Sequence, residues 1–179
     1  HQGVGAEMAV AAALSENELP QFLDGLGKPP LLLILDGVQD PHNLGACLRS
    51  ADAAGVDAVI LPKDRSAPLN ATARKVACGA AETVPVVRVT NLARTLRTIR
   101  DAGVWLYGAA GEARQALYDV DLSGPVALVL GAEGPGLRQK TRDTCDMLVK
   151  IDFAGAFGSL NVSNAAAVAL YASQAQGLA

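Results

Sequence analysis

Short apolar runs alternate with segments of helix-type periodicity from Pro29 to the end of the chain. Runs that are apolar at every position predict strands buried on both faces, as in a parallel sheet. We expect such strands at Leu31–Leu35, Ala58–Leu61, Val84–Val89, Val104–Tyr107, Val126–Leu130 and Leu148–Ile151. We expect helices at Leu44–Ala54, Leu69–Cys78, Leu92–Ala102, Leu137–Cys145 and Val162–Ala175. This alternation predicts an α/β fold, a mostly parallel sheet with helices on both faces.

The composition indicates one globular domain with a sizeable core. The chain has 179 residues, is 50% hydrophobic and carries a net charge of −3. The apolar run Val4–Leu14 is too short to span a bilayer, and no basic segment precedes it as in a signal peptide. We therefore expect a cytoplasmic protein with no membrane partner.

The first 28 residues differ from the rest of the chain. His1 stands where a methionine would begin a complete protein, so we expect this sequence to be a piece of a longer one. Ser15 and Glu18 are spaced as a capping box for a short helix, which Pro20 would limit. The sequence therefore predicts a linker with a short helix over residues 1–28 and the main domain over residues 29–179.

Cysteine spacing offers no metal chemistry. Cys47, Cys78 and Cys145 are odd in number and lack the intervals of metal ligands. We expect them to be small buried residues in a reducing compartment, and we expect no metal site.

Glycines follow several of the expected strands, at the edge where parallel sheets bind ligands. One glycine-rich turn follows Leu130, a loop follows Ile151, and a third candidate is Gly108–Gly111. Glycine lets the backbone approach a ligand closely. The dinucleotide fingerprint GxGxxG after the first strand and the phosphate loop GxxxxGK[ST] are both absent from the sequence, which disfavours a Rossmann dehydrogenase or a phosphate-loop enzyme.

The expected helix near residue 44 carries two candidate polar residues. Asn43 stands where a helix N-cap is expected, and Arg49 follows nearly two turns later among small and apolar residues. A purely structural alternative is equally open at this point. In it, Asn43 is only a cap and Arg49 only pairs with Asp52.

Three ordered blocks then carry a family resemblance. They read Asn43-x-Gly45-x-x-x-Arg49-x-Ala51, Gly131-Ala132-Glu133-Gly134-x-Gly136 and Ser159-Leu160-Asn161-Val162-Ser163-x-Ala165. Together they resemble the signature motifs of the SpoU family of RNA ribose 2′-O-methyltransferases, in the SPOUT superfamily. The stretches Ile34–Asn43 and Lys63–Ser66 look especially like the branch of that family that methylates a guanosine of large-subunit ribosomal RNA.

The resemblance implies a fold, a cofactor and an assembly. It implies a trefoil knot in the C-terminal part of the sheet, S-adenosylmethionine as the cofactor, and a homodimer with active sites near the subunit interface. It makes residues 29–179 the catalytic domain, following an N-terminal RNA-binding domain that this sequence lacks. The positions that match the cofactor pocket are Gly131, Gly134, Ile151, Ser159 and Leu160. Gly158 stands where many relatives carry serine, and Ile151 and Leu160 could instead be plain core.

The resemblance also assigns catalytic roles. Methyl transfer to a ribose 2′-oxygen requires positioning and removal of the hydroxyl proton. The residue that matches Arg49 is the family's proposed general base, but a guanidinium is almost never neutral, so we expect a charged Arg49 to stabilise the forming alkoxide. Glu133 would orient Arg49 or a ribose hydroxyl, or else only stabilise its turn. Asn43 and Asn161 would orient groups by hydrogen bonds, and we interpret His42 as a loop residue.

RNA binding has to be reconciled with the acidic total charge. Residues 63–100 contain eight basic and two acidic side chains, a local charge of +6. Arg94, Arg97 and Arg100 are spaced to share one helix face, which is either an RNA contact or simply solvated. Large-subunit ribosomal RNA is therefore the expected partner. Transfer RNA, another RNA site, or a catalytically idle RNA-binding module of the same fold are the alternatives.

Overall fold

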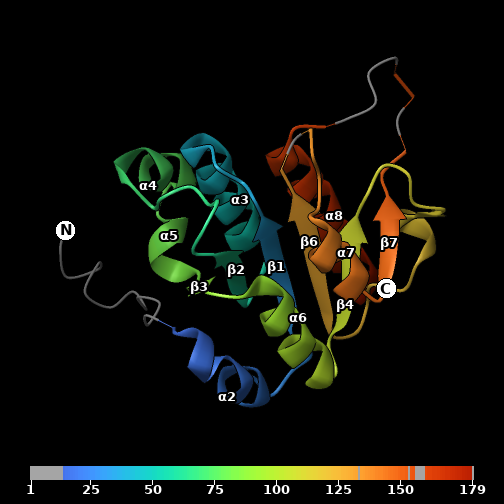
Figure 1. The fold of residues 1–179 in the computed structure, drawn as a ribbon, viewed down its shortest axis with the longest axis horizontal. Helices are drawn as coiled ribbons and strands as arrows, with labels where there is room; N and C mark the ends of the chain where they lie inside the picture. Colours follow the sequence, from blue (N-terminus) through green and yellow to red (C-terminus); the bar gives the residue numbers. More distant parts are fainter. Residues whose placement is uncertain (1–13, 133, 153, 156–159, 179) are drawn as a thin grey trace.

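Seven parallel strands form one sheet in the residues that the computed structural model describes, which are 14–132, 134–152, 154–155 and 160–178. The sheet order is β3-β2-β1-β6-β4-β7-β5 (Figure 1). The strands are β1 Leu31–Asp36, β2 Ala58–Pro62, β3 Val86–Val89, β4 Trp105–Ala109, β5 Gln115–Ala116, β6 Val126–Gly131 and β7 Met147–Lys150. The α/β fold with a parallel sheet, predicted from the apolar runs, is confirmed.

Helices cover both faces of this sheet. On one face, α3 (Pro41–Ala54), α4 (Ala71–Ala77), α5 (Ala80–Thr83) and α8 (Val162–Leu178) contribute to one buried cluster. On the other face, α2 (Leu19–Asp24) and α6 (Leu92–Asp101) contribute to a second one, and α7 (Gln139–Thr144) packs beside α6. Two 3₁₀ turns, η1 (Glu16–Glu18) and η2 (Leu117–Asp119), complete the described elements.

The central strand β1 shows why its run is apolar throughout. Leu33 and Leu35 belong to the first cluster, whereas Leu32 and Ile34 belong to the second. Alternate side chains of a strand point to opposite faces, so a strand between two helical layers must be apolar at every position. The same reasoning accounts for β2 and β6, which are buried along almost their whole length.

The strand order determines which loops meet. β6 lies between β1 and β4, with Gly131 paired in register with Asp36 at the carboxyl end. β7 follows β4 outward, so the loops after β4, β6 and β7 share one edge, the upper edge in Figure 1. The trefoil knot implied by the family resemblance is consistent with this order and stays a prediction.

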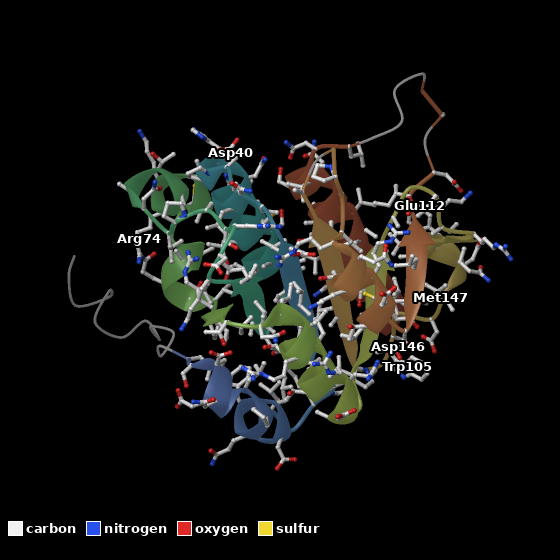
Figure 2. All side chains as sticks on the ribbon, in the orientation of Figure 1. Asp40, Arg74, Trp105, Glu112, Asp146 and Met147 are labelled. Atoms are coloured by element: carbon white, nitrogen blue, oxygen red, sulfur yellow. The ribbon has the colours of Figure 1, made fainter. Side chains whose placement is uncertain are left out.

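Several expected details are wrong. The short elements β5 and α5 were not expected at all. Helix α3 is capped by Asp40 (Figure 2), whose carboxylate accepts from His42 N (2.9 Å). Asn43 is therefore not the N-cap, and His42 is not a loop residue but lies in the first helical turn. The 3₁₀ turn that Ser15 caps ends at Glu18, before Pro20, and Pro20 itself lies in the first turn of the following helix α2.

The expected capping box at the start of the described chain is confirmed. Glu18 Oε1 accepts from Ser15 N (3.0 Å) and Oγ (2.9 Å). Leu19 and Leu23 then bury against the face that carries α6. Across the described residues, none of the helices has the length and apolar character needed to cross a membrane.

Candidate functional site

A cavity of about 240 Å³ opens at the carboxyl ends of β4, β6 and β7. Its lining comes from the three loops expected to meet there and from the start of α8. The lining residues are Ala109, Ala110, Gly111, Leu130, Gly131, Ala132, Gly134, Gly136, Val149, Ile151, Leu160, Val162 and Ala165. Each of these side chains is apolar or absent, so the polar groups that these described residues offer to a ligand belong to the backbone.

Four of the five predicted cofactor residues line this one cavity: Gly131, Gly134, Ile151 and Leu160. The fifth, Ser159, lies outside the described residues, as does Gly158. Ile151 and Leu160 are half-buried at the cavity wall. An apolar slot edged by backbone donors and acceptors suits a flat heterocycle such as adenine.

Residues 131–138, which we call the glycine turn, need glycine for two different reasons. A Cβ on Gly131 would overlap the backbone of Gly136, because Ala132 and Gly136 form a bridge in which Gly136 N donates to Ala132 O (2.8 Å). Gly134 instead has φ +83° and open space around its missing Cβ. The first glycine therefore permits a close backbone approach, and the second permits the left-handed conformation beside the cavity.

An ion pair with a buried carboxylate, which no sequence spacing indicated, joins β1 to the glycine turn. The Asp36 carboxylate, 0% exposed, accepts from Arg138 Nε (2.7 Å) and Nη2 (2.7 Å). It also accepts from the Arg138 backbone N (3.0 Å). The two residues are 102 positions apart, which is why periodicity and motif spacing could not connect them.

The first and third blocks meet through two asparagines. Asn161 Nδ2 donates to Asn43 Oδ1 (3.0 Å), and Asn161 Oδ1 accepts from Ser163 N (2.8 Å) at the start of α8. Asn161 therefore links the first turn of α3 to the N-terminus of α8. Its chain neighbours Leu160 and Val162 line the cavity, so the pair of asparagines lies directly beside it.

The other predicted catalytic residues are placed differently. Arg49 is exposed on α3 and is not among the lining residues of the cavity. Within the described part of the chain it forms no ion pair with Asp52, whose carboxylate accepts from Thr83 Oγ1 (3.0 Å). The structural alternative for Arg49 therefore lacks its partner. Glu133 lies outside the described residues.

The basic segment 63–100 is partly used inside the fold. Arg74 pairs with Glu82 (2.6 Å), Arg88 Nη2 donates to Ala67 O (2.9 Å), and Arg100 Nη1 donates to Thr144 O (3.3 Å). The exposed guanidinium groups of Arg94 and Arg97 on α6 have no side-chain partner in the described structure. The shared exposed helix face is confirmed, and its use in RNA binding stays a prediction.

The cysteines show no reactive site. Burial raises the pKa of the Cys47 thiol to about 12, and burial followed by the charges of Asp146 and Asp36 raises the pKa of Cys145 to about 12. Both thiols are therefore neutral at physiological pH. Cys78 is exposed at the end of α4 and Cys145 is half-buried, so the expectation that all three are buried holds only for Cys47. Among the described residues, His, Cys, Asp and Glu side chains form no group able to hold a metal ion.

Comparison with known proteins places these features in a family. The family model described as "SpoU rRNA Methylase family" matches residues 30–171. The chain is 59% identical over 179 residues to the 23S rRNA (guanosine-2′-O-)-methyltransferase RlmB of Vibrio parahaemolyticus, covering all of this chain and 72% of that protein.

Two solved structures have similar folds. The SpoU methyltransferase AviRb from Streptomyces viridochromogenes, in complex with the cofactor AdoMet, matches with a TM-score of 0.79 and 29% identity. That match covers 86% of this chain and 63% of AviRb. The A. aeolicus TrmH/SpoU tRNA modifying enzyme matches with a TM-score of 0.75 and 25% identity, covering 90% and 81% of the two chains.

Proposed function

The chain belongs to the SpoU rRNA methylase family, and from that membership we propose that it transfers a methyl group from S-adenosylmethionine to a ribose 2′-oxygen of a guanosine in 23S ribosomal RNA. One observation carries the proposal. The second and third family blocks line one apolar cavity, and the third also connects that cavity to Asn43 of the first block. Three segments far apart in the sequence thus converge on one place.

The residues present fit the cofactor. Gly131, Gly134, Ile151 and Leu160 would hold it, with the glycine backbone close to the ligand and the two aliphatic side chains against the adenine. When bound, S-adenosylmethionine supplies an activated methyl group on a sulfonium.

The polar residues of the three family blocks would act on the ribose. The Asn161–Asn43 bond uses the Oδ1 atom of Asn43, and the Asn43 Nδ2 group has no hydrogen-bond partner among the described residues. That group is available to a ribose or phosphate oxygen. We assign the charged Arg49 to stabilising the forming 2′-alkoxide, and Glu133 to orienting Arg49 or a ribose hydroxyl.

The remaining parts of the proposal concern assembly and substrate. We propose a homodimer with active sites near the subunit interface, a catalytic domain over residues 29–179 preceded by a linker, and an RNA contact through the cations of α6. The family match over residues 30–171 supports the domain boundary. Ribosomal RNA as the substrate would also place the protein in the cytoplasm.

The test is methyl transfer from labelled S-adenosylmethionine to total RNA from a bacterial strain that lacks the corresponding enzyme. We expect a single ribose-methylated guanosine in 23S RNA, mapped by primer extension at low nucleotide concentration. Gly134→Val should abolish the signal by filling the cavity, and Gly124→Ala, at a glycine with open space and away from the cavity, should not change it. Label in transfer RNA alone would overturn the substrate. Cofactor or RNA binding without any transfer would support the idle module instead.

A further inference from the structure

Asp36 holds both ends of the glycine turn. Its backbone carbonyl accepts from Ala132 N (3.2 Å), where the turn leaves β6. Its carboxylate accepts from the backbone N (3.0 Å) and the guanidinium of Arg138, where the turn ends. One residue of β1 thus contacts the beginning and the end of a segment whose middle lines the cavity.

Two further contacts of the described residues lie near the ends of the turn: Gly136 N donates to Ala132 O (2.8 Å), and Leu137 is buried in the second cluster. Gly134 and Gly136 have positive φ angles and nothing near their missing Cβ positions, so neither contributes a side-chain contact. Glycine-rich segments have the largest backbone freedom in solution and lose the most on ordering. The contacts of Asp36 at the two ends therefore act together with the Ala132–Gly136 bond and the buried Leu137 to restrict the segment between them.

The ion pair is better suited to orienting the Arg138 end of the glycine turn than to stabilising the fold. The Asp36 carboxylate is fully buried, and the cost of removing a charge from water offsets much of the attraction within an ion pair. A guanidinium, in contrast, presents its donors in a rigid planar fork that matches a carboxylate. Arg138 is 39% exposed while the Asp36 carboxylate is fully buried, so the carboxylate is the fixed partner and the arginine is oriented by it.

We propose that Asp36 and Arg138 are positioning residues for the cofactor. Their ion pair holds the glycine turn in the shape in which its backbone lines the cavity, and so it sets the affinity for the cofactor. The inference rests on the proposed function, because it takes S-adenosylmethionine as the ligand of that cavity.

The opposite end of β1 provides a matched control. Lys28 Nζ donates to both carboxylate oxygens of Asp57 (2.7 and 2.8 Å), and that carboxylate also accepts from Leu31 N (2.9 Å). The composition is the same as at the carboxyl end: an aspartate, a cation and a backbone amide. Because carboxyl and amino ends of parallel strands lie at opposite edges, this second pair is far from the cavity edge.

The experiment measures the dissociation constant of S-adenosylhomocysteine by calorimetry, well below each variant's melting transition. Arg138→Gln should raise the dissociation constant about tenfold or more, because the backbone that lines the cavity would no longer be held in place. Lys28→Gln should leave the dissociation constant within about twofold of wild type. Arg138→Lys keeps the charge but loses the planar fork, so its dissociation constant should lie between those of wild type and Arg138→Gln. Asp36→Asn combined with Arg138→Gln should weaken binding no further than the single change, because the two residues act as one unit.

The possible results separate the two proposals. A folded Arg138→Gln protein that binds within about twofold of wild type would overturn the positioning role and leave the proposed function intact. If Arg138→Gln does not fold, Arg138→Lys decides, and unchanged affinity there has the same meaning. A wild-type chain that binds neither S-adenosylmethionine nor S-adenosylhomocysteine would overturn the proposed function and this inference with it.

Discussion

Single residues at this site differ in how firmly the fold holds them. The Asn161 amide is held by three hydrogen bonds, since Nδ2 donates to Asn43 and Oδ1 accepts from both N and Oγ of Ser163, so its orientation is set before any ligand arrives. Arg49 is the opposite case, an exposed cation with neither a hydrogen bond nor an ion pair in the described structure. A preorganised group can orient a substrate, whereas a free guanidinium is available to a charge that develops outside its own helix.

Variants of Arg49 test this difference. Arg49→Lys keeps a positive charge and loses the planar fork, and Arg49→Ala loses both. If Arg49 stabilises the alkoxide, both variants should fold and bind cofactor nearly normally, and turnover should fall by about 10²-fold or more. Asp52→Asn should keep wild-type turnover, because Asp52 bonds to Thr83 and not to Arg49. The measurement is single-turnover methyl transfer alongside thermal melting.

The lysine variant is the decisive one. If Arg49 had only a local role on its helix, Arg49→Lys would retain almost full activity. A rate within about threefold of wild type would end the catalytic assignment.

Among the elements, the glycine turn shows how one short segment combines a structural and a ligand-binding requirement. Position 131 requires glycine because a Cβ there would overlap the backbone of Gly136. Position 134 requires glycine because its φ angle is positive and because it lines the cavity. The two glycines should therefore respond differently to substitution.

Gly131→Ala should destabilise the protein, because the added Cβ overlaps backbone atoms that cannot rotate away. Overpacking of this kind costs about 1–3 kcal/mol.

Gly134→Val should also carry a conformational cost, since a β-branched residue is strained at positive φ, but its main effect should be the loss of cofactor binding. Thermal melting and calorimetry on both variants, with Gly124→Ala as the control, check the distinction. Equal cofactor affinity in Gly134→Val and wild type would remove the pocket assignment.

The sequence predicts most elements because a run that is apolar at every position indicates a strand buried on both faces. The expected strands and helices from Leu31 onward all occur, with ends shifted by a few residues. Short pieces such as β5 and α5 span too few residues for any periodicity to develop. The start of α3 was misplaced although Asp40-Pro41 carries the usual signal, a carboxylate cap followed by proline in the first turn.

Long-range partners were beyond the reach of sequence patterns. The strand pattern placed the loops after Leu130 and Ile151 at one edge of the sheet, but only the family resemblance singled out Gly131, Gly134, Ile151 and Leu160, four residues that line one cavity in the structure. Asp36 and Arg138 belong to no spacing rule, because their contact depends on β6 lying next to β1. The knot stays a prediction for the same reason, since local periodicity carries no information about threading.

The whole molecule presents two features that favour a second subunit. Arg49 is exposed and does not line the cavity of its own chain. Helix α8 has no charged residue from Val162 to Leu178 and exposes 47% of Tyr171. Charge depletion together with an exposed aromatic residue is typical of the core of an interface. A stable dimer would bury upwards of roughly 1,200 Å².

Light scattering tests the assembly directly. At micromolar concentration and near-physiological salt, the chain should have the mass of a dimer. Tyr171→Glu, which places a charge on the otherwise uncharged helix α8, should shift the measured mass toward that of a monomer, whereas Lys28→Gln should leave the mass unchanged. A monomer mass for the wild-type chain would count against the dimer and against sites near its interface.

Mixed dimers then test whether Arg49 completes the site of the other subunit. Neither Arg49→Ala, which lacks the guanidinium, nor Gly134→Val, which lacks the pocket, should be active alone. If Arg49 acts across the interface, a mixed dimer pairs the intact pocket of the first variant with the intact arginine of the second. Random exchange of equal amounts makes half of the dimers mixed, each with one working site, so activity should return to roughly a quarter of the wild-type rate in a two-fold symmetric assembly. If Arg49 acts within its own chain, every site lacks one of the two parts and mixing restores nothing.

Methyl transfer is measured before and after denaturation and joint refolding of the two variants. A mixture that stays inactive while light scattering confirms exchange into dimers would exclude a shared site.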